Sequence, residues 1–148
     1  MYKSNHLKNI VVDWMGEVSF VNPYAITLTM RVNRFNDISQ NLRYFIKRLN
    51  RRYLKSSHER GGKCLKVFPI LEGNDVINYH YHLIIDNPFF NRNEEFQKTI
   101  KECWRKTPLY NSSIDIKSMK DKGWIRYMMK SRSKKSIMDS IDWCNTHI

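Results

Sequence analysis

Two kinds of hydrophobic periodicity follow one another along this chain, and their order restricts the possible folds more than any other feature. Apolar residues recur with the period of two that is typical of half-buried strands in four segments: residues 24–32, 63–72, 78–86 and 113–118. Helical spacing is found in three further segments, and a short helix is expected near the end: residues 37–54, 96–104, 123–130 and 136–143. No linker or repeat separates them, so we expect one domain over residues 1–148.

The order β-α-β-β-α-β-α is the split βαβ pattern of a ferredoxin-like sandwich and predicts an α+β protein. In that architecture helices cover one face of an antiparallel sheet, and the other face can stay open. Pro69 lies inside the second strand segment, and its missing amide hydrogen predicts that this strand is bulged or at an edge of the sheet. The first 20 residues fit either an extra strand or a segment that lies over an edge.

Alternation within the strands predicts which side chains share the open face. In the strand at residues 78–86 the apolar set meets the helices: Tyr79, Tyr81, Leu83 and Ile85. His80 and His82 therefore point to the open face. The same reasoning adds four residues from neighbouring segments to that face: Thr27, Thr29, Arg31 and Glu72.

His80 and His82 are two residues apart in a strand, so both imidazoles can approach one ion. Glu72, from the preceding antiparallel strand, can add an oxygen. Two nitrogens and one oxygen with open positions suit a catalytic divalent metal, Mg²⁺ or Mn²⁺, when a phosphate supplies further oxygens. The alternative is a solvated histidine pair on the surface of a sheet.

A second candidate group lies on the predicted helix at residues 123–130. Tyr127 and Lys130 are three residues apart and share a helix face. A tyrosine can attack a phosphodiester when a metal polarises the phosphate and a lysine balances the developing charge. The same Tyr-x-x-Lys spacing also occurs at Tyr44 and Lys47, and Tyr127 also fits an ordinary core stripe with Trp124.

The charge of the chain predicts a polyanionic partner. Lysines and arginines number 26 against 14 acidic residues, which gives a net charge of +12, and nucleic acid is the first expectation for so basic a domain. No stretch is apolar enough to span a membrane or to serve as a secretion signal. Three widely spaced cysteines favour neither disulfides nor a zinc site, so we expect a cytoplasmic protein, in the host cell of a plasmid, phage or virus.

Three motifs, in this order, resemble those of the HUH endonuclease superfamily, specifically single-tyrosine Rep-type initiators of rolling-circle replication. They are AITLTM at residues 25–30, HYH at 80–82 and YMMK at 127–130. Ala25 stands where a larger apolar residue is common in the family, and Ser131 occupies the position of the second tyrosine of two-tyrosine relatives. Because the family's nucleophile follows the HUH strand, the resemblance selects Tyr127 over Tyr44.

The resemblance implies a complete reaction. Glu72, His80 and His82 would hold the metal, and Tyr127, assisted by Lys130, would nick a single-stranded origin through a 5′-phosphotyrosine intermediate. Thr27, Thr29 and Arg31 would contact the DNA, which is often presented beside a hairpin. The sequence contains no GxxxxGK[ST] motif, so we expect any helicase, like the polymerase, to be a separate protein, and the chain to be a monomer or weak dimer.

Two other classes of protein fit parts of this pattern. Single-tyrosine HUH transposases share the fold and size, although their helix usually carries a glutamine after the tyrosine, so Lys130 favours the Rep type. A non-enzymatic nucleic-acid-binding module would use aromatic residues on its open sheet. In the strand assignment above, Phe68 is the one aromatic residue expected to be exposed there, and such a module leaves the histidine pair unexplained.

Overall fold

The computed structural model describes residues 2–31, 35–73, 79–130 and 137–148. Ser131 therefore lies outside the described residues. Helices and strands follow one another in the order α1 (Tyr2–Glu17), β1 (Asn22–Met30), α2 (Phe35–Leu54), α3 (Ser56–Glu59), β2 (Val67–Glu72), β3 (His80–Asn87), α4 (Asn93–Arg105), β4 (Tyr110–Ser118), α5 (Gly123–Met128), α6 (Ile137–Ser140) and the 3₁₀ turn η1 (Trp143–Asn145). All four predicted strands are present, but β2 begins later and β4 earlier than the alternation indicated.

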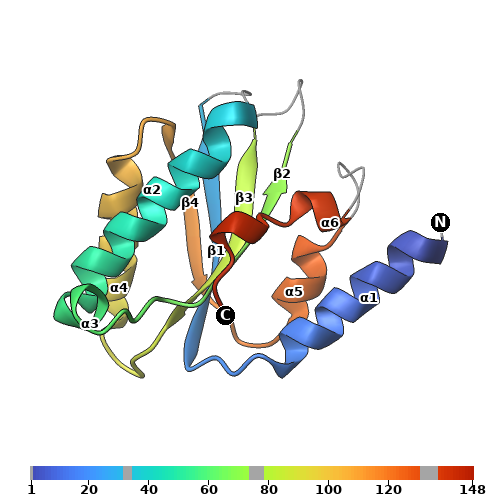
Figure 1. Ribbon diagram of the computed structural model, residues 1–148, viewed down its shortest axis with the longest axis horizontal. Coiled ribbons are helices and arrows are strands. Elements are labelled where there is room, and N and C mark those ends of the chain that lie inside the picture. The colour runs from blue at the N-terminus through green and yellow to red at the C-terminus, as the bar shows by residue number, and fades with distance from the viewer. Residues whose placement is uncertain (1, 32–34, 74–78, 131–136) are drawn as a thin grey trace.

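The four strands form one antiparallel sheet in the order β2-β3-β1-β4, which confirms the predicted α+β class (Figure 1). β2 lies at an edge, as Pro69 predicted. The pairing aligns three rows of residues across the face opposite α2 and α4. From β2 towards β4 they are Phe68–Ile84–Ala25–Lys117, Ile70–His82–Thr27–Asp115 and Glu72–His80–Thr29.

The main core lies between the sheet and the pair α2 and α4, which cover one face (Figure 1). Its strand residues are those that the alternation assigned to the helices, including Tyr81 and Leu83. On the helix side, Phe45 of α2 meets Trp104 of α4 edge to face, with ring centroids 5.6 Å apart. Burial of large apolar and aromatic side chains here supplies the dominant stabilising term of the fold.

The second face is also partly covered. Residues 2–17, which the sequence suggested would be a strand or an edge-covering segment, form the helix α1 instead, and α1, α5 and α6 lie on this side of the sheet (Figure 1). A second core joins Met15, Ile84 and Ile125 with Phe68. The prediction that Phe68 is exposed was therefore wrong: its side chain is fully buried and meets Trp14 of α1 edge to face at 6.3 Å.

The C-terminal segment protects the edge strand β2. Ile141 and His147 form isolated antiparallel bridges with Ile70 and Val67, and the amide of Asp142 donates to the carbonyl of Pro69 at 3.0 Å. An edge strand with unpaired backbone groups invites association with other chains, so this segment covers a vulnerable edge.

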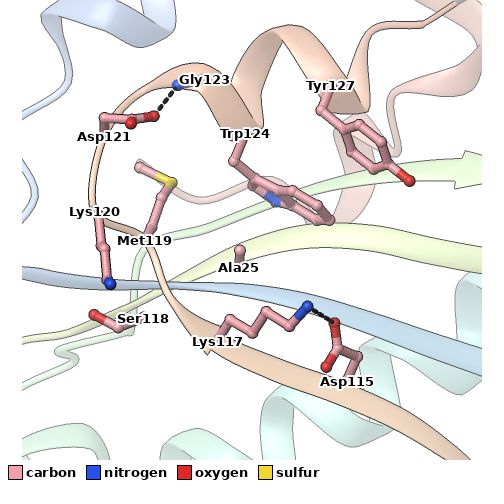
Figure 2. Close-up of a pocket in the computed structure, with 10 residues that line it drawn as sticks. All are labelled: Ala25, Asp115, Lys117, Ser118, Met119, Lys120, Asp121, Gly123, Trp124 and Tyr127. Carbon is pink, nitrogen blue, oxygen red and sulfur yellow. Dashed lines mark hydrogen bonds and ion pairs between the residues drawn. The ribbon is translucent and has the colours of Figure 1, made fainter.

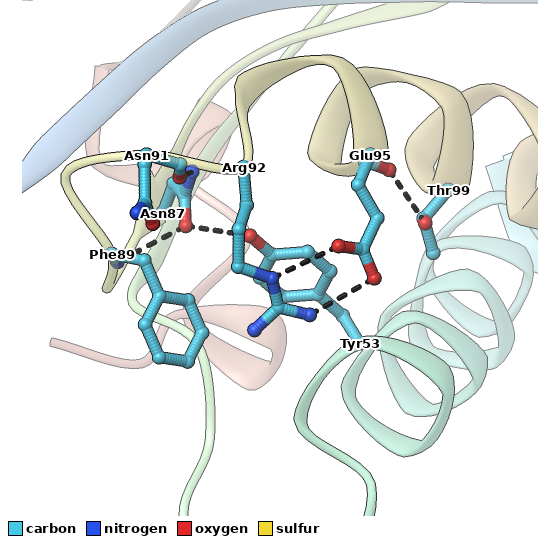
Figure 3. A network of polar contacts seen from close by, with 7 residues as sticks. All are labelled: Tyr53, Asn87, Phe89, Asn91, Arg92, Glu95 and Thr99. Carbon is cyan, nitrogen blue, oxygen red and sulfur yellow. Dashed lines mark hydrogen bonds and ion pairs between the residues drawn. The ribbon is translucent and has the colours of Figure 1, made fainter.

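The turn after β3 is held by a buried asparagine (Figure 3). The side-chain oxygen of Asn87 accepts from the Tyr53 hydroxyl at 2.8 Å and from the Phe89 amide at 3.1 Å. Arg92 has a left-handed backbone, with φ of 67°, and its guanidinium lies over the rings of both Tyr53 and Phe89. These contacts fix the end of β3 and the start of α4. Among the described residues, no helix is both long and apolar enough to cross a bilayer.

Candidate metal and nucleophile site

Glu72, His80 and His82 meet at the open end of the sheet's second face. Glu72 is the last residue of β2 and pairs with His80 across the strands, and His82 follows on the same face of β3. The carboxylate oxygen Oε2 of Glu72 lies 3.0 Å from Nε2 of His82 and 3.7 Å from Nε2 of His80. The predicted convergence of these three side chains is therefore present.

A threonine orients the more buried of the two imidazoles. Thr27 of β1 pairs with His82, and a hydrogen bond of 3.1 Å joins Oγ1 of Thr27 to Nδ1 of His82. With Nδ1 protonated, His82 donates this bond and keeps the lone pair of Nε2 on the side of Glu72. A partner of this kind on the second ring nitrogen is typical of metal-binding histidines.

The donor set fits a divalent cation. One ligand atom from each of Glu72, His80 and His82 can be chosen so that all lie within 4.8 Å of one another. Ligands about 2.1 Å from an ion are separated by at most about 4.2 Å, so small adjustments would bring the three onto one ion. Two imidazoles and one carboxylate leave coordination positions for oxygens of a substrate.

Tyr127 lies beside this cluster and is accessible from solvent. Its ring is 5.5 Å from that of His82, centroid to centroid, and its side chain is 45% exposed. The ammonium of Lys130 lies 4.7 Å from the centre of the Tyr127 ring. Tyr127 thus does not belong to the buried stripe of α5, which consists of Ile125 and Met128.

Trp124 fixes the position of Tyr127. The two rings are stacked with centroids 4.9 Å apart, and the edge of Trp124 also meets His82 at 5.4 Å. The indole nitrogen donates to the carbonyl of Leu83 in β3 at 3.4 Å. The sequence analysis weighed Trp124 only as core. The spacing of three between Trp124 and Tyr127 on one helix was the signal that could have indicated the stack.

The remaining predicted residues are placed as follows. Thr29 pairs with His80 across β1 and β3, and so lies on the face of the cluster. Arg31 follows the end of β1 and is exposed, and its backbone amide donates to the carbonyl of Leu109. Tyr44, from the other Tyr-x-x-Lys match, lies on α2, which packs on the opposite face of the sheet.

Comparison with family models gives one match. Residues 23–136 match the model of the family described as replication-associated protein ORF2. The chain belongs to this family. The matched range contains β1, the Glu72–His80–His82 cluster and α5, whereas α1 and the C-terminal segment with α6 and η1 lie outside it. Neither a comparison with curated proteins nor one with solved structures finds a match.

In this replication-associated protein a pocket adjoins the cluster on the side of β4 (Figure 2). It has a volume of about 670 Å³ and lies between β4, the turn that follows it and the start of α5. Ala25, Lys117, Trp124 and Tyr127 are among the residues that line it. The sequence analysis did not anticipate the pocket, because it forms only where α5 crosses the sheet.

Proposed function

We propose that this replication-associated protein is a metal-dependent endonuclease and ligase that nicks single-stranded DNA at a replication origin and starts rolling-circle replication. Membership of the family supports a role in the initiation of replication. The observation that carries the chemical part is the contact of an exposed phenol, Tyr127, with His82 of a Glu-His-His cluster. This pairing supplies a nucleophile beside a site for a cation.

In the proposed reaction, Oη of Tyr127 attacks the scissile phosphorus and loses its proton to solvent. The bond from phosphorus to the 3′ oxygen breaks, and that oxygen takes up a proton. The products are a 3′-hydroxyl, which can prime synthesis, and a 5′-phosphotyrosine. Since one phosphodiester replaces another, the reverse attack can rejoin the ends without ATP.

The other residues of the site have supporting roles in this proposal. A Mg²⁺ or Mn²⁺ ion held by Glu72, His80 and His82 would polarise the scissile phosphate. Lys130, whose ammonium lies over the Tyr127 ring, would balance negative charge as the phenol is deprotonated. Thr27, Thr29 and Arg31 would contact the DNA backbone next to the cluster. The net charge of +12 would attract origin DNA, including an adjacent hairpin, while helicase and polymerase act as separate proteins.

The decisive experiment replaces Tyr127 with phenylalanine. The protein is incubated with a pool of single-stranded oligonucleotides and Mn²⁺, and covalent adducts are detected after denaturing electrophoresis. We expect wild-type protein to form an adduct that maps to residue 127, and Tyr127→Phe to form none while it still binds the oligonucleotides.

Tyr44→Phe is a matched control. Tyr44 is 44% exposed, carries a cation over its ring in Arg48, and begins the second Tyr-x-x-Lys match. Its adduct yield should equal that of wild-type protein. An adduct that persists in Tyr127→Phe, or one that disappears in Tyr44→Phe, would contradict the assignment of the nucleophile. Absence of any adduct with the wild-type protein would favour a binding module instead.

A further inference from the structure

The pocket beside Tyr127 lies on the far side of Trp124 from the second core. Figure 2 shows Ala25 at its back, with Trp124 on one side and Lys117 and Asp115 on the other. Its volume of about 670 Å³ is within the range of about 300–1,000 Å³ that is typical of small-molecule sites. Tyr127 lines the pocket as well as contacting His82, so whatever enters the pocket lies next to the proposed nucleophile.

The pocket exists because side-chain size changes along one row of the sheet. In the row Phe68–Ile84–Ala25–Lys117, the first two side chains are large and fully buried in the second core. At the third position Ala25 offers only a methyl group, and at the fourth Lys117 is exposed. The apolar filling therefore stops at Ile84, and a hollow remains above Ala25.

The lining combines an apolar interior with a polar rim. Ala25, Met119 and the indole of Trp124 supply apolar surface. Asp115 and Lys117 form an ion pair of 3.5 Å at the side of β4. A nucleobase has flat apolar faces and an edge of hydrogen-bond donors and acceptors, and sites that hold single-stranded DNA commonly combine aromatic surface with basic side chains.

We propose that this pocket receives one nucleobase of the DNA strand next to the scissile phosphate, and that the small side chain of Ala25 makes room for it. The base would lie against Trp124 with its polar edge towards Asp115 and Lys117. This proposal rests on the proposed function and adds to it a subsite that holds one nucleotide while Tyr127 meets the neighbouring phosphate.

The test fills the pocket from the protein side and empties it from the DNA side. Ala25→Leu places a larger side chain in the hollow, and Ala25→Ser is the control that keeps the side chain small. Both are made together with Tyr127→Phe, so that equilibrium binding is measured without cleavage. Fluorescence anisotropy is read with the oligonucleotide that wild-type protein nicks, and with a series in which each position near the nick is made abasic in turn.

We expect Ala25→Leu to weaken binding of the intact oligonucleotide about 5- to 150-fold, the loss that corresponds to one stacked base. One abasic position should weaken binding to the Ala25 parent by a similar factor, and on that oligonucleotide Ala25→Leu and the parent should bind equally. Ala25→Ser should bind like the parent throughout.

Two results would overturn the subsite: full affinity of Ala25→Leu for the intact oligonucleotide, or an affinity loss in Ala25→Leu that no abasic position removes. Neither result depends on the chemistry. Failure of the proposed function would instead be seen as the absence of a Tyr127 adduct with wild-type protein.

Discussion

Thr27 controls the orientation of His82, and replacing it with valine tests whether that control matters for metal binding. Valine has nearly the same shape as threonine and lacks only the hydroxyl that is 3.1 Å from Nδ1 of His82. The imidazole is almost fully buried, with a side chain 9% exposed, so water cannot readily take the place of the lost hydroxyl. The substitution therefore removes the hydrogen bond that orients the ring through Nδ1.

The size of the effect follows from two independent arguments. Leaving a buried polar group unsatisfied costs about 1–3 kcal/mol. Loss of an outer hydrogen-bond partner of a metal ligand typically lowers affinity about 10- to 100-fold, which corresponds to about 1.4–2.7 kcal/mol. Both lead us to expect that Thr27→Val binds Mn²⁺ about 10- to 100-fold more weakly than wild-type protein.

The assay is isothermal titration of the protein with Mn²⁺ at one fixed pH, because protonation of the imidazoles competes with metal binding. Thr29→Val is the matched control, since it makes the same change one pair further along β1, opposite His80 rather than His82. Its affinity should stay within about threefold of wild type. The reasoning is refuted if Thr27→Val binds Mn²⁺ as tightly as wild-type protein, or if both variants lose affinity equally.

Two further predictions concern stability. Asp142→Ala should lower the free energy of unfolding by about 1–3 kcal/mol in urea titrations, because its carboxylate accepts from Tyr81 at 2.7 Å and from Ser39 at 3.0 Å; the exposed Asp139→Ala should change it little. Burial raises the pKa of Asp86 above its ordinary value, against the lowering effect of the backbone amides that it accepts from. The folded state therefore binds this proton more tightly than the unfolded state, and stability should fall as pH rises from about 4 through the raised pKa. Asp86→Asn should lack this fall, so a difference between wild type and variant that does not change with pH would contradict the assignment.

The alternation of side chains predicted the sheet and the cluster because both depend on local geometry. Once 78–86 is a strand, His80 and His82 must share a face, and Glu72 reaches them through simple antiparallel pairing. Pro69 marked the edge strand for an equally local reason, its missing amide hydrogen. The motif resemblance selected Tyr127, which periodicity alone had left as either core or nucleophile.

The partial cover of the second face could not be read from local patterns. α1 contributes Val11, Val12 and Met15 to the second core, while Leu7 and Ile10 remain at least 40% exposed, so apolar residues do not mark one face of this helix. Without α1, Phe68 was assigned to the exposed side. The pocket was missed for the same reason, because it depends on where α5 crosses the strands rather than on any run of residues.

The position of the site at the boundary of the second core explains how one face can be both rigid and accessible. Towards β2, the core packs against Ile70 and Ile84, and Trp124 continues this packing over His82, which is only 7% exposed. Burial there restricts the imidazole to one orientation. Beyond Trp124 the packing ends, so Tyr127 and the pocket over Ala25 remain open to solvent. A ligand cluster gains from fixed side chains, whereas a polymeric substrate needs open surface, and the border between the two lies at the stacked pair Trp124 and Tyr127.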